Sequence, residues 1–70
     1  MKRYYFFKPY KIGENTVPAG TDLSVVNGVI YYNEGMVDDY YQGVFGRLIA
    51  KEERFGFDIL RPRQQVYNKV

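Results

Sequence analysis

The sequence predicts a small α+β domain in which an antiparallel sheet of three to four strands packs on one helix. Three observations lead to this fold class. An Asn27-Gly28 pair joins two runs rich in β-branched and aromatic residues, which is typical of a β-hairpin over residues 22–33. Residues 38–53 carry an apolar stripe with helical spacing. The 70-residue chain has the length of a single domain, residues 1–70, and shows no linker or internal repeat.

The hairpin is expected to organise the rest of the chain, because its two-residue turn sets the register of both strands. A type I′ turn requires positive φ at both central residues, and Asn-Gly tolerates this conformation. The register then divides the side chains between two faces. The face expected to pack on the helix carries Leu23, Val25, Ile30 and Tyr32. The second face carries Ser24, Val26, Val29 and Tyr31, and it is apolar enough that another strand layer, a second subunit or a target should cover it.

The helix is predicted from about residue 38 to residue 53, with Asp38 or Asp39 as its N-cap. Its core-facing stripe consists of Tyr41, Val44, Phe45, Leu48 and Ile49. The other side carries the small residues Gly43, Gly46 and Ala50. Each glycine inside a helix costs roughly 0.8 to 1 kcal/mol relative to alanine, so a compensating contact is expected. A partner or target backbone could approach there; alternatively a strand of the same chain crosses there, or the helix starts near Val44.

The N-terminal segment Arg3–Lys8 has the composition of a strand that Pro9 ends or confines to an edge. Its side chains alternate, so Tyr4 and Phe6 share one face while Tyr5 and Phe7 share the other. Two interpretations remain open: the strand is buried on both faces, or one aromatic face is a binding or dimer surface.

Short elements are expected on either side of the hairpin and helix. A short strand over residues 10–12 precedes a polar loop that continues to residue 16. Beyond the helix, alternating apolar residues predict a strand over residues 55–61, which Pro62 ends. Residues 63–70 either add a strand or fray as a tail.

The composition excludes several kinds of chemistry. The chain has no Cys and no His, so it has no disulfide, no Cys- or His-ligated zinc site and no nucleophile activated by histidine. The adjacent carboxylates at 38–39 and 52–53 are expected to be solvated charges at the helix ends, and no glycine loop for phosphate is present. We therefore expect no enzymatic activity, no cofactor and no metal. With an aromatic content of 19%, aromatic packing and oligomerisation are the remaining ways to stabilise so small a domain.

No targeting or membrane segment is predicted. The charged start Met1–Arg3 is followed by four aromatic residues, and Lys8 interrupts them before an apolar segment of useful length can form. We therefore expect a cytoplasmic protein with no membrane partner.

The charges are unevenly distributed although the net charge is only +2. Residues 1–13 carry four bases and no acid, residues 14–39 carry five acids and no base, and residues 40–70 are again basic. Bases alternate with aromatic residues near the N-terminus, which is typical of surfaces that stack single-stranded nucleic acid. The candidates for this alternative function are Lys2, Arg3, Tyr4, Lys8, Tyr10 and Lys11. The acidic middle segment and the lack of an RNA-binding motif argue against it.

A protein-binding module agrees better with exposed aromatic strands and a small-residue helix face. The candidate partner-binding residues are Tyr5, Phe7, Val26, Val29, Tyr31, Gly43, Gly46 and Ala50.

Four phrases within residues 17–49, a stretch of about half of the chain, resemble small phage- and prophage-encoded proteins of Gram-positive bacteria. These phrases are Val17–Leu23, Asn27–Tyr32, Gly35–Val37 and Tyr41–Ile49. The resemblance assigns no functional residue. It implies a factor that binds a host protein in the host cytoplasm and inhibits or redirects it, and we expect this factor to be a homodimer.

Overall fold

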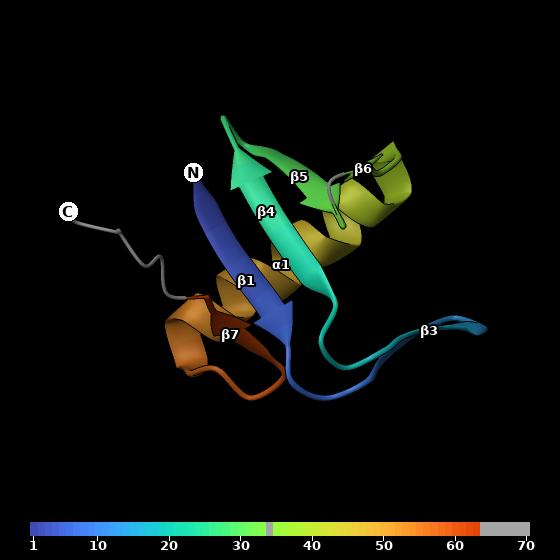
Figure 1. Ribbon diagram of the computed structural model, residues 1–70, viewed down its shortest axis with the longest axis vertical. Coiled ribbons are helices and arrows are strands. Elements are labelled where there is room, and N and C mark those ends of the chain that lie inside the picture. The colour runs from blue at the N-terminus through green and yellow to red at the C-terminus, as the bar shows by residue number, and fades with distance from the viewer. Residues whose placement is uncertain (34, 64–70) are drawn as a thin grey trace, which may run out of the picture.

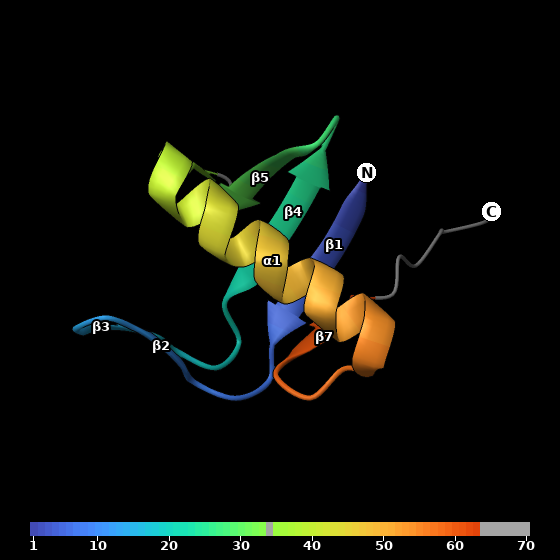
Figure 2. The same ribbon diagram turned by 180° about the vertical axis from the view of Figure 1, so that it is seen from behind.

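A five-stranded antiparallel sheet with one helix across one of its faces forms the body of the protein (Figures 1 and 2). The structure is a computed structural model, and it describes residues 1–33 and 35–63. The strand order is β6-β5-β4-β1-β7. The elements are β1 (Lys2–Phe6), β4 (Asp22–Val26), β5 (Val29–Tyr32), β6 (Gly35–Met36), β7 (Leu60–Pro62) and α1 (Asp39–Phe55). The predicted α+β fold class is confirmed, and within the described residues no helix is long and apolar enough to cross a membrane.

The sheet has five strands where three to four were expected, because two very short strands pair at its edges. β6 consists of two residues and pairs with Tyr31 and Tyr32 of β5. β7 consists of three residues and pairs with β1. Strands this short carry almost no alternation pattern, so sequence periodicity cannot identify them.

The predicted hairpin is confirmed in every paired residue. β4 and β5 pair from Leu23 opposite Tyr32 to Val26 opposite Val29. Asn27 and Gly28 have φ of 51° and 79°, the positive values that a type I′ turn requires at both positions. The predicted core face meets α1.

The helix confirms the expected stripe and N-cap. The Asp38 side chain accepts the Tyr41 N–H at 3.1 Å, and the helix ends two residues later than expected, where Gly56 at φ 109° donates its N–H to the Glu52 carbonyl. The ring of Phe45 is 1% exposed and contacts those of Phe6 and Tyr32, with centroids 6.0 Å away in both cases. The buried apolar core consists of Tyr4, Phe6, Ile12, Val17, Leu23, Ile30, Phe45, Leu48, Ile49 and Leu60.

The strand predicted over residues 55–61 is wrong for most of its length. Phe55 is the last helical residue and is exposed, and the strand begins only at Leu60. The reason is the carboxylate of Glu52, which was expected to be a solvated charge at the helix end but is 3% exposed. It accepts the N–H groups of Asp58 and Ile59 at 2.7 and 3.0 Å. These two bonds hold the chain in a loop until it reaches β1. Arg63 follows β7, and the rest of the predicted tail lies outside the described residues.

The short strands β2 (Tyr10–Ile12) and β3 (Asn15–Val17) form a separate hairpin, here called the arm, which projects from one end of the sheet (Figure 1). The strand over residues 10–12 was expected, but the loop expected after it contains β3. Gly13 has φ of 59° and occupies the first central position of the turn, as a type II′ hairpin requires. Stacking of Phe6 on Tyr10, with centroids 5.8 Å apart, joins the arm to the core.

The edge of β5 beyond Met36 is completed by a side chain rather than a strand. The amide of Gln42 in α1 accepts the Ile30 N–H at 3.0 Å and donates to the Ile30 carbonyl at 2.8 Å. It also donates to the Val37 carbonyl at 3.3 Å. Gln42 therefore takes the place that the next residue of β6 would occupy.

Candidate functional site: the open face of the sheet

The helix covers one face of the sheet and leaves the other uncovered by any described element, and we call this second face the open face (Figures 1 and 2). The pairing register determines which side chains lie on it, because successive residues of a strand alternate between faces. From one edge to the other, the open face carries Met36, Val29, Tyr31, Asp22, Ser24, Val26, Arg3, Tyr5, Phe7, Arg61 and Arg63.

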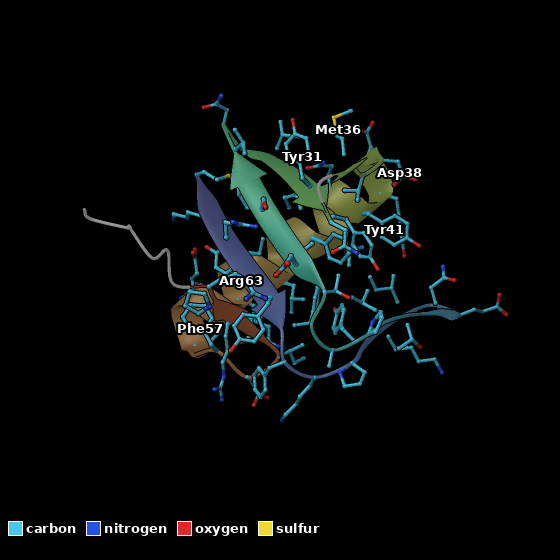
Figure 3. All side chains as sticks on the ribbon, viewed as in Figure 1. Tyr31, Met36, Asp38, Tyr41, Phe57 and Arg63 are labelled. Atoms are coloured by element: carbon cyan, nitrogen blue, oxygen red, sulfur yellow. The ribbon has the colours of Figure 1, made fainter. Side chains whose placement is uncertain are left out.

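The half of the open face over β5, β6 and the end of β4 is apolar. Val26, Val29 and Tyr31 are each partly exposed, and the Met36 side chain is 71% exposed. Figure 3 shows Tyr31 and Met36 next to each other at this edge. A large exposed apolar side chain beside three partly exposed ones is typical of a surface that another molecule covers.

The half of the open face over β1 and β7 combines arginines with aromatic rings. The guanidinium carbon of Arg61 lies 3.9 Å from the ring centroid of Phe7, and that of Arg63 lies 4.7 Å from the centroid of Tyr5. Both distances are within the range of a cation–π interaction. Arg63 also forms an ion pair with Asp22, with Nη2 at 2.6 Å from Oδ1. We call Arg3, Arg61 and Arg63 the arginine strip.

Arg3 lies beside Arg63 in the register, since the Arg63 N–H donates to the Arg3 carbonyl at 2.8 Å. Its Nε is buried and has no hydrogen-bond partner among the described residues. No described carboxylate forms an ion pair with Arg3 or Arg61. Among the described residues, the three cations of the arginine strip thus face one acid, Asp22.

The predicted partner-binding residues fall on two separate surfaces. Tyr5, Phe7, Val26, Val29 and Tyr31 come together on the open face, as the alternation predicted. The small residues of α1 lie on the other side of the sheet. Of these, Gly46 approaches β5, since a Cβ built there would be 3.9 Å from Cδ1 of Ile30, whereas a Cβ on Gly43 would meet only Nη1 of Arg47 at 3.6 Å. Ala50 is exposed.

The six residues predicted for nucleic acid do not form one surface. Tyr4 is 3% exposed and lies in the core, and its hydroxyl donates to Glu53. Burial, that hydrogen bond and the negative charge of Glu53 together raise the pKa of Tyr4 above its ordinary value. Lys2 also pairs with Glu53, and Lys8 pairs with Asp58 at 3.7 Å. Tyr10 stacks on Phe6, Lys11 lies on the arm, and only Arg3 belongs to the open face.

Sequence reasoning missed four residues of this face, namely Asp22, Met36, Arg61 and Arg63. Met36 is in a strand too short to show alternation. The spacing of Arg61 and Arg63 on either side of Pro62 was a usable signal, since residues two apart in a strand share a face. The strand predicted over residues 55–61 was instead based on its alternating apolar residues and stopped before Arg63.

A cleft lies between the arm and the start of α1. It is a cleft of about 370 Å³ with mostly apolar walls, and the side chains of Asn15 and Tyr41 form a hydrogen bond of 3.1 Å within it. Its lining residues are Ile12, Asn15, Thr16, Val17, Tyr32, Val37, Tyr41 and Phe45. None of these described lining residues is charged.

No group of three or more acidic side chains within residues 1–33 and 35–63 is placed to hold a metal ion. The sequence matches no family model and no curated protein, and its fold matches no solved structure.

Proposed function

We propose that this protein is a non-enzymatic protein-binding module that acts through the open face of its sheet. The observation that carries the proposal is the continuous apolar half formed by Val26, Val29, Tyr31 and Met36, which no other described element covers. An interface with an apolar centre and a charged rim is the usual anatomy of a protein–protein contact. Here the arginine strip supplies the rim on one side.

The proposal includes a phage origin, a host protein as the target, an inhibiting or redirecting effect on it, and action in the host cytoplasm. The support for these parts is the resemblance of the four sequence phrases to phage- and prophage-encoded proteins. It also includes a homodimer, supported by the small size of the domain and its exposed apolar surface. The dimer is tested by the mass in solution at micromolar concentration, where a clean 8.3 kDa monomer would remove it.

The target-binding function is tested by affinity capture from a host lysate with matched variants. Tyr31→Asp places a charge in the apolar half, and Tyr40→Asp makes the same change at a 64% exposed position in the first turn of α1. We expect Tyr31→Asp to lose a specifically captured protein and Tyr40→Asp to retain it, with both variants folded by circular dichroism. Equal capture by the two variants would refute the open face as the binding surface.

A further inference from the structure

The arginine strip indicates the chemistry of the partner. We infer that the open face recognises a protein segment in which carboxylates lie next to apolar side chains. The carboxylates would bind the arginine strip, and the apolar side chains would pack on Val29, Tyr31 and Met36. This inference rests on the proposed function and adds the chemical class of its target.

The first argument is that the guanidinium groups are held in place before any partner arrives. Arg61 stacks on Phe7 and Arg63 stacks on Tyr5, and both rings belong to β1, which pairs with a strand on each side, or to its immediate continuation. A stacked guanidinium keeps its N–H groups available at its edges, where a carboxylate accepts two parallel hydrogen bonds. Less side-chain freedom is then lost on binding than with a free arginine.

The second argument is the local excess of positive charge. Among the described residues Asp22 is the one acid of the open face, and its carboxylate pairs with Arg63, with Oδ1 at 2.8 Å from Nε and 2.6 Å from Nη2. The buried Nε of Arg3 has no described partner. An acidic ligand lying across β1 would therefore meet the exposed side chain of Arg61 and the half-buried side chain of Arg3, neither of which has a described carboxylate partner.

The third argument favours an acidic protein segment over single-stranded nucleic acid. Nucleic acid would need ring faces on which bases can stack, but guanidinium groups cover those of Tyr5 and Phe7. The neighbouring bases Lys2 and Lys8 are paired with acids, which reduces the attraction for a polyphosphate backbone. The adjoining apolar half suits leucine-like side chains.

The test is an NMR titration of the full, ¹⁵N-labelled chain with a capped hexapeptide of alternating glutamate and leucine. The isosteric peptide with glutamine in place of glutamate is the neutral control, and an oligothymidylate is the nucleic-acid control. The double variant Arg3→Gln/Arg61→Gln removes two cations from the strip. Arg47→Gln/Arg54→Gln makes the same charge change on α1, on the other side of the sheet.

We expect the glutamate peptide to shift the amide signals of Arg3, Val29 and Arg61 and to bind at least about tenfold more tightly than the glutamine peptide. The strip variant should bind the glutamate peptide about tenfold more weakly, and the helix variant should equal the wild type. Equal binding of both peptides, no binding of either, or equal loss in both variants would overturn the inference. Tighter binding of oligothymidylate at the same amides would overturn it in favour of nucleic acid.

The capture experiment separates the failure of this inference from that of the proposed function. If Tyr31→Asp loses the captured protein while Arg3→Gln/Arg61→Gln retains it, the proposed function stands and the acidic specificity is refuted. If the peptide results hold but Tyr31→Asp captures normally, the anion site stands and the proposed function is refuted.

Discussion

Replacing Gln42 by methionine should destabilise the fold by about 2 kcal/mol. Methionine has nearly the same length and helix propensity as glutamine, so the change isolates the hydrogen bonds of the amide. The two bonds to Ile30, at 3.0 and 2.8 Å, should contribute roughly 1 kcal/mol each, and the 3.3 Å bond to Val37 should contribute less. For a domain of this size, that loss lowers the melting temperature by about 8 to 16 °C.

Gln42→Glu is the informative companion variant. A carboxylate still accepts the Ile30 N–H but faces the carbonyls of Ile30 and Val37 without a proton to donate. The folded state therefore raises the pKa of the introduced carboxyl, so the variant is destabilised relative to wild type as pH rises above about 4.3. At lower pH the protonated group donates again and the difference should shrink.

The assay is urea denaturation followed by far-UV circular dichroism, because the chain has no Trp. Each variant is compared with wild type at the same pH, which cancels the titration of the other acids. A methionine variant within about 0.5 kcal/mol of wild type, or a glutamate variant whose deficit does not change with pH, would refute the proposed edge role of Gln42.

Three further changes test other features of the fold. Gly43→Ala should stabilise by about 0.5 to 1 kcal/mol, since the added Cβ meets only Arg47 at an ordinary 3.6 Å; a lower melting temperature would show a tighter site. Gly28→Ala should destabilise by about 1 kcal/mol in urea denaturation, because φ there is 79° and alanine disfavours it; an unchanged midpoint would contradict the type I′ turn. Tyr4→Phe should lose about 1 kcal/mol at neutral pH. Wild type should lose this advantage as pH rises above about 10, because the raised pKa of Tyr4 lets the unfolded state deprotonate first; a pH-independent difference would contradict that linkage.

The two glycines of α1, Gly43 and Gly46, have different neighbours. A Cβ on Gly46 would lie 3.9 Å from Cδ1 of Ile30 in β5, an ordinary contact, so β5 restricts side chains larger than alanine at this position. Gly43 has no such neighbour beyond its own helix. Gly46→Leu should therefore lower the melting temperature more than Gly43→Leu. Thermal denaturation of the two variants measures this difference.

Local sequence by itself determined the hairpin and the helix. Asn27-Gly28 admits few turn types, and once the turn is set the register of β4 and β5 follows without any tertiary information. The apolar stripe of the helix and its Asp38 N-cap likewise depend only on residues three and four apart in the sequence. The alternation in β1 correctly separated Tyr4 and Phe6 from Tyr5 and Phe7.

Only the tertiary structure decided how the remaining polar groups are paired and which charges meet. The Glu52 carboxylate accepts two backbone N–H groups and so keeps most of residues 55–61 out of the predicted strand. Gln42, which lies in α1 twelve residues after Ile30, forms the hydrogen bonds that end the edge of the sheet. The arginine strip joins residues 3, 61 and 63, which periodicity cannot connect because pairing of β1 with β7 is a long-range choice. Local patterns reveal which face of an element is apolar, whereas its neighbours across the sheet are selected by the packing of the whole chain.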